Sequence, residues 1–334
     1  MSLFSADSGT LYRDHFGLER KPFELTPDSN MLFLGEGHKN ALAVLKHGVV
    51  SDKAFLLFTG GVGTGKTTLI NVLSKTLENP GYVCVISNPT LELDDFFYYF
   101  AAQLGLLFDG NKAKFLVLFS KLLEQCKKSN RRVLLIIDEA HALPTDLLEE
   151  MRLLVNMAAE LKDVLSIFLV GQPELLERLN ERQLSPLSQR IAVRYHLDQL
   201  SAEEATQYVL FRLNRSGGKN PRLFTDQALQ LIYQATGGNP RQINVLCDTA
   251  LRVACARGKT EVDEKIVRKA VEQLHIPGDS SAFHLPPLRP SWRRWLLPGV
   301  AAILVIDGLF IAYAYHKGWV QAALGYLARQ LGMG

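Results

Sequence analysis

Short, wholly apolar runs alternate with longer amphipathic stretches over the first 200 residues of the chain. Such runs are typical of strands that are buried on both faces of a parallel sheet. Strands are therefore predicted at residues 54–59, 82–87, 133–137, 165–170 and 193–197. Helices are predicted at 38–48, from a glycine-rich turn to 77, and at 93–105, 114–127 and 147–161. Alternation of this kind predicts an α/β fold, with right-handed βαβ units and helices on both faces of a parallel sheet.

Only helical patterns follow residue 200. Ser201 and Glu204 have the spacing of a capping box, which predicts a helix that begins there and continues to about residue 214. Further helices are predicted from 225 to a Gly-Gly pair at 237–238, from an Asn-Pro pair at 239–240 to 256, and over 263–274. We therefore expect a core at 36–200 and a small all-helical domain at 201–275, preceded by an irregular segment at 1–35.

One long apolar segment lies near the C-terminal end of the sequence. Residues 276–294 are rich in proline and serine and predict a linker. Residues 295–315 contain a single ionisable residue, Asp307, and are flanked by Trp and Tyr side chains. A helix of this length spans about 32 Å, enough for a hydrocarbon core of roughly 30 Å. The sequence thus predicts one transmembrane helix, with residues 316–334 as a short extracytoplasmic tail.

Two observations bear on this membrane segment. Arginines precede it at 289, 293 and 294, and the positive-inside rule then leaves the larger part of the chain in the cytoplasm. The role of Asp307 stays open between pairing with a partner helix and snorkelling towards the interface.

Charge and cysteine content exclude some classes of protein. The net charge is +3, and acidic and basic residues are interleaved, which argues against a dedicated nucleic-acid binder. The four cysteines form no CxxC pair, so zinc-ribbon and thioredoxin chemistry have no support. The N-terminal residues contain no apolar signal segment.

A glycine-rich sequence between the first predicted strand and its helix carries the clearest chemical signal. It fits G-x-x-x-x-G-K-[ST], and we expect it to bind ATP through Gly60, Gly61, Val62, Gly63, Thr64, Gly65, Lys66, Thr67 and Thr68. Backbone N–H groups of such a loop surround phosphates, and the helix that follows directs its positive end at them. Lys66 is expected to reach the β and γ phosphates, and the Thr67 hydroxyl to coordinate Mg²⁺.

Two acidic residues follow the third predicted strand. Asp138 and Glu139 have the Walker B arrangement, in which the first acid holds Mg²⁺ and the second polarises the attacking water. His141 is left open between a structural role and contact with the γ-phosphate. Gln172 follows the next strand, where a polar side chain can sense that phosphate or simply form a turn.

These motifs together resemble the AAA+ ATPases. Four further stretches resemble, more narrowly, the secretion-pathway A ATPases and their pilus and exopolysaccharide relatives: residues 16–18 (FGL), 21–28 (KPFELTPD), 169–175 (LVGQPEL) and 189–191 (QRI). The resemblance implies that Gln172 is the sensor-1 residue and Arg241 the sensor-2 arginine of a helical lid. It also implies that an arginine finger completes a neighbouring subunit's site, for which Arg190 is preferred over Arg182 and Arg194.

The resemblance places residues 23–34 near the adenine and implies self-assembly into a ring or filament. The expected function is an inner-membrane ATPase that drives or regulates assembly of an envelope machine: type II secretion, a type IV pilus or polysaccharide export. Larger relatives carry a peptidoglycan-binding domain after the membrane helix. The predicted tail at 316–334 is too short for such a domain, so direct binding to the cell wall is in doubt. Two alternatives are a DNA-binding helper of transposition or replication, and an assembly scaffold with weak turnover.

Overall fold

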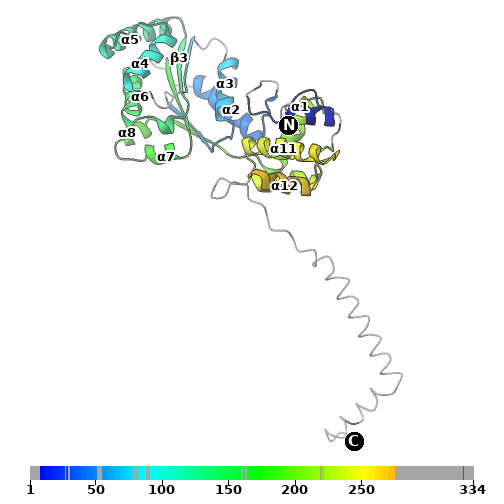
Figure 1. The fold of residues 1–334 in the computed structure, drawn as a ribbon. Helices are drawn as coiled ribbons and strands as arrows, with labels where there is room; N and C mark the ends of the chain where they lie inside the picture. Colours follow the sequence, from blue (N-terminus) through cyan, green and yellow to red (C-terminus); the bar gives the residue numbers. More distant parts are fainter. Residues whose placement is uncertain are drawn as a thin grey trace. The chain divides into compact units, whose positions relative to one another are not determined.

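The computed structural model describes residues 8–26, 28, 31–50, 55–77, 81–87, 91–158, 161, 164–218, 220, 222–274 and 326. A five-stranded parallel sheet forms its centre, with strand order β2-β3-β4-β1-β5 (Figure 1). The strands are β1 (Phe55–Gly60), β2 (Gly81–Ile86), β3 (Arg132–Ile137), β4 (Leu165–Gly171) and β5 (Val193–Leu197). This sheet confirms the predicted α/β fold.

Helices cover both faces of this sheet. The helices of the core are α2 (Glu36–Val50), α3 (Lys66–Thr76), α4 (Leu93–Leu104), α5 (Lys112–Lys128), α6 (Thr145–Ala158), α7 (Glu174–Leu179) and α8 (Ser185–Ser188). Side chains alternate along each strand, so Leu57 packs in one hydrophobic cluster with α4, α5 and α6, while Phe58 packs in another with α2 and α3. Every residue of β1 is buried, which explains why its first four residues, 55–58, are all large and apolar.

Four helices after β5 form the lid, which we define as α9 (Ala202–Arg215), α10 (Asp226–Thr236), α11 (Pro240–Ala256) and α12 (Glu264–Leu274). Their caps are those that the sequence indicates. Ser201 and Glu204 form both hydrogen bonds of a capping box at α9. Gly237 ends α10 in the left-handed region, and the Asn239 side chain caps α11.

The N-terminal segment differs from its predicted irregular structure. Residues 8–16 form helix α1 (Ser8–Phe16), so the irregular assignment of 1–35 was wrong there. The Tyr12 side chain is fully buried and donates a 2.7 Å hydrogen bond to Asp248 on α11. Leu18 and Phe23 belong to the same hydrophobic cluster as the lid helices. Packing against the lid therefore stabilises a helix that is too short to be predicted from its own sequence.

The elements above all belong to one compact unit, Met1–Leu285. None of the helices in the described part of the chain is both long and apolar enough to cross a membrane. The predicted membrane helix at 295–315, its linker and all of its tail except Tyr326 lie outside the described residues.

Candidate functional site: a nucleotide pocket

The loop between β1 and α3 has a backbone that depends on glycine at two positions. Gly63 has φ 77° and Gly65 has φ 101°, a region that residues with a β-carbon rarely adopt. Gly65 is the N-cap of α3, and no side chain caps this helix. The first N–H groups of α3 are therefore left to bind an anion, together with the positive end of the helix dipole.

Lys66 lies inside this loop. The residue is only 5% exposed, and its Nζ donates 2.9 Å hydrogen bonds to the carbonyl oxygens of Gly60 and Gly61. Burial lowers the pKa of Lys66, an effect that the nearby carboxylates of Glu139 and Asp138 oppose. A buried ammonium that, among the described residues, donates to two carbonyl oxygens fits a site that accepts phosphate.

The end of β3 meets the start of α3 through one hydrogen bond. Thr67 Oγ1 donates to Asp138 Oδ2 at 2.6 Å, and Asp138 is 2% exposed. The other carboxylate oxygen accepts the backbone N–H of Glu139 at 3.0 Å. A hydroxyl and a carboxylate side by side, next to the anion-binding loop, are the oxygen ligands that fit Mg²⁺ bound to a nucleotide.

Glu139, His141 and Gln172 form a small polar network beside the loop. The backbone of Glu139 adopts the left-handed conformation, with φ 55°. His141 Nδ1 lies 3.4 Å from Glu139 Oε2, and its Nε2 lies 2.9 Å from the Gln172 amide nitrogen. The Gln172 amide donates to Nε2 when the ring proton is on Nδ1, facing Glu139. Arg178 donates to the His141 carbonyl oxygen and fixes this turn.

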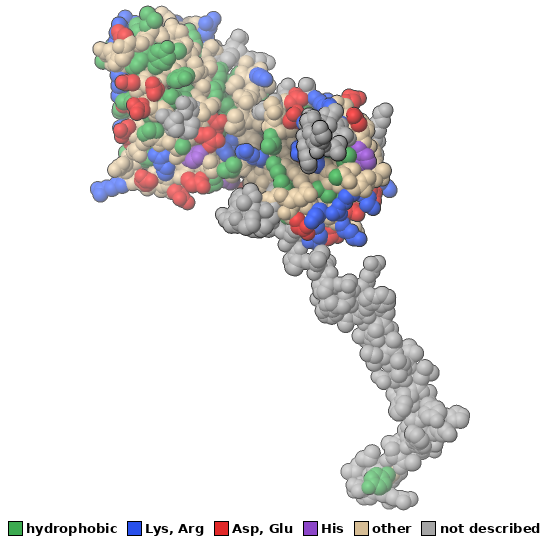
Figure 2. Space-filling model, in the orientation of Figure 1, with side chains coloured by type: hydrophobic (Ala, Val, Ile, Leu, Met, Phe, Trp, Pro, Cys, Tyr) green, Lys and Arg blue, Asp and Glu red, His purple; other side chains and the backbone are tan. Residues whose placement is uncertain are grey.

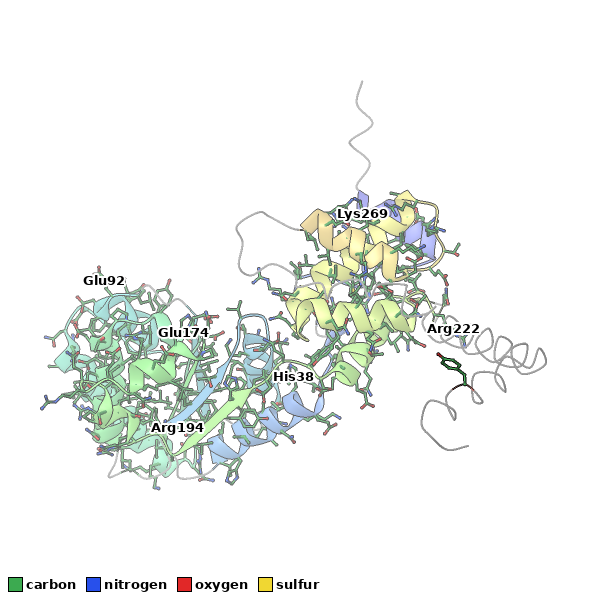
Figure 3. All side chains as sticks on the ribbon, turned by 90° about the horizontal axis from the view of Figure 1, so that it is seen from below. His38, Glu92, Glu174, Arg194, Arg222 and Lys269 are labelled. Carbon is green, nitrogen blue, oxygen red and sulfur yellow. The ribbon has the colours of Figure 1, made fainter. Side chains whose placement is uncertain are left out.

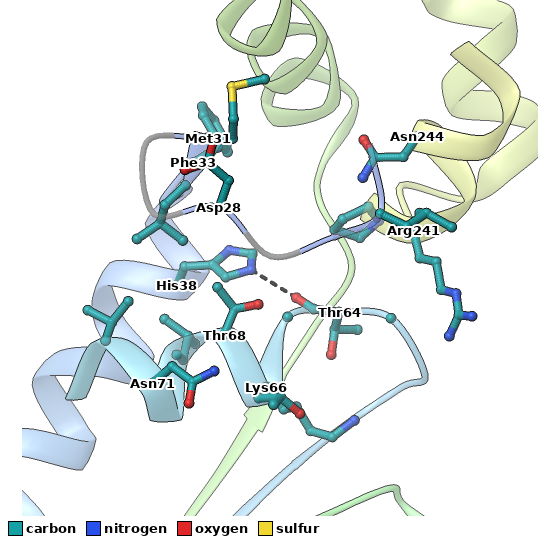
Figure 4. A pocket seen from close by; sticks show the side chains of 18 of the residues that line it. Asp28, Met31, Phe33, His38, Thr64, Lys66, Thr68, Asn71, Arg241 and Asn244 are labelled. Carbon is teal, nitrogen blue, oxygen red and sulfur yellow. Dashed lines mark hydrogen bonds between the residues drawn. The ribbon is translucent and has the colours of Figure 1, made fainter. Parts of the chain in front are cut away.

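A pocket of about 990 Å³ opens over the loop (Figure 4). Its lining includes Val62 to Thr68 of the loop, Glu139, Gln172 and Arg241, all of them predicted site residues. Gly60, Gly61 and Asp138 lie just outside the lining. Residues of the N-terminal segment also line it, among them Met31 and Phe33, and the position of 23–34 near the adenine stays a prediction.

Several pocket residues were missed by the sequence analysis. His38, on α2, is 7% exposed, and its Nε2 lies 2.9 Å from the Thr64 carbonyl oxygen (Figure 4). Tyr208, Arg212 and Asn244 enter from the lid. A single histidine, tyrosine or asparagine within a helix gives no local signal, so only the folded chain identifies these residues as part of the site.

The lid contacts the loop directly. Asn239 Nδ2 donates a 2.7 Å hydrogen bond to the Val62 carbonyl oxygen, while its Oδ1 caps α11. A β-carbon added at Gly63 would lie 2.8 Å from Arg241 Cβ. The first turn of α11 thus lies over the phosphate-binding loop, and Arg241 is an exposed side chain at the pocket wall.

The three candidates for an arginine finger lie away from this pocket. All three are exposed. Arg194, labelled in Figure 3, donates to the carbonyl and hydroxyl oxygens of Ser188. Within the described residues, the side chains of Arg182 and Arg190 form no hydrogen bond or ion pair.

Comparisons with known proteins agree with this geometry. Residues 49–179 match the family described as AAA domain. General secretion pathway protein A of Aeromonas hydrophila is 35% identical over 303 residues, which are 89% of this chain and 53% of that protein. The chain therefore spans about half the length of this relative.

Solved structures share the fold. Drosophila ORC bound to DNA matches with a TM-score of 0.59 at 17% identity, over 83% of this chain and 68% of that one. The Aeropyrum pernix ORC2 protein, in ADPNP and ADP complexes, matches with a TM-score of 0.56 at 20% identity, over 76% and 72%. The chain thus contains an AAA domain at residues 49–179 and is similar, over 89% of its length, to general secretion pathway protein A.

Proposed function

We propose that this protein binds Mg²⁺–ATP in the pocket and hydrolyses it to ADP and phosphate. The observation that carries the proposal is the Thr67–Asp138 hydrogen bond, because it joins the phosphate-binding loop to the acidic end of β3. Lys66 from the loop and Glu139 from the turn after β3 belong to the same small region. Catalysis in such a site comes mostly from positioning and from stabilisation of charge.

Each residue has a separate task in this proposal. Lys66 and the N–H groups at the start of α3 bind the phosphates, and Thr67 and Asp138 hold Mg²⁺, which neutralises phosphate charge when bound. Glu139 accepts a proton from water as the water oxygen attacks the γ-phosphorus and the β–γ bridging oxygen leaves with ADP. Gln172 and Arg241 contact the phosphates from β4 and the lid.

Arg190 is proposed to act in a neighbouring subunit. Its side chain is exposed and forms no hydrogen bond within the described residues, which leaves the guanidinium available to another copy of the chain. An arginine supplied in trans can raise the rate by roughly 10³–10⁵-fold in well-studied NTPases. Hydrolysis would then depend on assembly into a ring or filament.

The cellular role is proposed from the relative rather than from the pocket. The matched protein is named for general secretion, and it covers 89% of this chain. We infer that the chain acts in assembly or regulation of an envelope machine for secretion, a pilus or polysaccharide export. Residues 295–315 supply the proposed anchor in the inner membrane.

A second candidate function is DNA binding, which the fold shared with DNA-bound Drosophila ORC favours. The net charge of +3 argues against it. Acidic and basic side chains are also interspersed on the face shown in Figure 2, rather than gathered into one basic surface.

The test is steady-state ATPase activity of the full chain in detergent, with and without duplex DNA at low salt. Glu139→Gln is the control and is expected to lose about 10²–10⁴-fold in rate while still binding ATP. Hydrolysis that depends on Glu139 and ignores DNA supports the envelope role. Several-fold stimulation by DNA would favour the second candidate. Tight binding with negligible turnover in every variant would favour a nucleotide-dependent scaffold.

A further inference from the structure

Asn244 and Tyr208 form a buried polar pair at the wall of the pocket. Each residue is 7% exposed, and the Tyr208 hydroxyl donates a 2.8 Å hydrogen bond to Asn244 Oδ1. Tyr208 comes from α9 and Asn244 from α11, so the pair also joins two helices of the lid. A buried asparagine with a fixed orientation is a feature that the fold alone does not require.

The hydrogen bond leaves the other half of the amide free. Because the phenol gives its one proton to Oδ1, the Asn244 nitrogen carries two N–H donors that are directed elsewhere. Nδ2 bonds to no other described residue, although Asn244 lines the pocket. Figure 4 shows this nitrogen turned toward the pocket. These N–H donors are therefore presented at the pocket wall without a partner among the described residues, which points to a ligand atom as their acceptor.

The position along α11 indicates which part of a nucleotide this donor meets. Arg241 lies over Gly63 of the phosphate-binding loop. Asn244 is three residues further on, about 4.5 Å along the helix and on the same side. The pocket wall here includes Met31 and the aromatic rings of Phe33 and Tyr208, whose centroids are 5.7 Å apart. An apolar region beyond the phosphates suits the base of the nucleotide rather than the ribose.

We propose that Asn244 is a specificity-determining residue that donates a hydrogen bond from Nδ2 to a ring nitrogen of adenine, with the Tyr208 hydroxyl fixing the amide. Adenine offers acceptors at N1, N3 and N7. Guanine shares the acceptors at N3 and N7 but carries a hydrogen on N1, so a bond to N1 also distinguishes the two bases. The pair therefore gives the pocket a means of recognising the base in addition to the phosphates. This inference rests on the proposed binding of ATP.

The experiment compares Mg²⁺–ATP with its 1-deaza, 3-deaza and 7-deaza analogues, each of which replaces one ring nitrogen by C–H. Dissociation constants are measured by calorimetry on the full chain in detergent. For the unaltered protein, one analogue should bind about 5- to 50-fold more weakly than ATP. Asn244→Ala should bind ATP more weakly by a similar factor and should no longer distinguish that analogue from ATP.

Two further variants separate recognition from folding. Tyr208→Phe keeps the ring but not the hydroxyl, and it should reduce the discrimination because the amide is no longer oriented. Asn214→Ala makes the same change at an exposed position of α9 and should keep the full discrimination. Circular dichroism checks that all variants fold.

The outcomes separate this inference from the proposed function. If ATP binds and every analogue binds equally well, or if Asn244→Ala discriminates as the unaltered protein does, the assignment of Asn244 is overturned while ATP binding stands. If no nucleotide binds at all, the proposed function fails, and the assignment of Asn244 fails with it.

Discussion

Thr67 and Asp138 are 71 residues apart in the sequence, yet the Thr67 hydroxyl donates a 2.6 Å hydrogen bond to Asp138 Oδ2. Thr67 lies in the first turn of helix α3, and Asp138 follows strand β3. Strand β4 lies between β1 and β3 in the sheet, so Gln172 emerges between the two motifs. The short hydrogen bond therefore joins the phosphate-binding loop directly to the acidic turn.

Removal of the Thr67 hydroxyl should weaken the dependence of activity on Mg²⁺. We expect Thr67→Ala to need at least about 10-fold more Mg²⁺ for half-maximal ATPase activity, because one oxygen ligand is lost. Thr67→Ser keeps the hydroxyl and should behave nearly as the unaltered protein does. A titration of activity against Mg²⁺ makes the comparison. Equal Mg²⁺ requirements for the Ala and Ser variants would contradict a role in metal binding.

His141 should act through its two neighbours, Glu139 and Gln172. We expect His141→Ala and Gln172→Ala each to lower the turnover number by about 10–100-fold. Because both changes break the same contact, the double variant should lose less than the product of the two effects. The measurements are the turnover number and ATP affinity of the unaltered protein, the two single variants and the double variant, which together form a double-mutant cycle. Effects that multiply fully would show that the two residues act independently.

Gly63 should be less tolerant of substitution than Gly61, although neither is a fixed position of the loop motif. Gly63 has φ 77°, and an added β-carbon would lie 2.8 Å from Arg241 Cβ and 2.9 Å from Asn239 Oδ1. We expect Gly63→Ala to cost about 1–3 kcal/mol and to reduce ATP affinity about 10-fold or more.

Gly61→Ala is the matched control. A β-carbon there would lie 3.0 Å from the end of the Gln199 side chain, which is able to move, and 3.7 Å from Thr64 Cγ2, an ordinary contact. Calorimetric ATP binding and thermal unfolding of both variants test the difference. If the Gly63→Ala and Gly61→Ala variants bound ATP equally tightly, the contact between the lid and the loop at Gly63 would not matter for nucleotide binding.

Stability should fall at mildly acidic pH because of His38. Burial lowers the pKa of His38 from its ordinary value of 6.5, although the Thr64 carbonyl and Glu204 oppose this. Below pH 6.5 the unfolded chain binds the proton more readily, so the stability from neutral His38 is present above that pH. This stability is lost as the pH falls towards the folded-state pKa.

The measurement is the free energy of unfolding from denaturant titrations at pH 7.5 and 5.5. His38→Gln keeps an N–H donor for Thr64 but cannot titrate, so it should lose less stability than the unaltered protein between the two pH values. Carboxylates that do not interact with His38 contribute equally to the pH dependence of both proteins, so their contribution cancels in the comparison. If the free energy of unfolding fell equally in both proteins, His38 would not be the cause of the loss of stability at acidic pH.

The sequence alone determined the sheet, its five strands and the motifs at its edge. Buried parallel strands need continuous apolar residues, and phosphate binding needs glycines and a lysine at fixed local spacings, so both leave a readable pattern. The caps of α9 and α11 were equally readable, because the hydrogen bonds of Ser201, Glu204 and Asn239 are formed within a few residues.

Only the tertiary structure decided which residues complete the pocket. Helix α1 exists because Tyr12 is buried against α11, and Arg212 holds the N-terminal segment by donating to the carbonyl oxygens of Pro22 and Glu24. Asn244 meets Tyr208 from another helix. Contacts between residues that are distant in the sequence follow no local period, so they become visible only when the chain has folded.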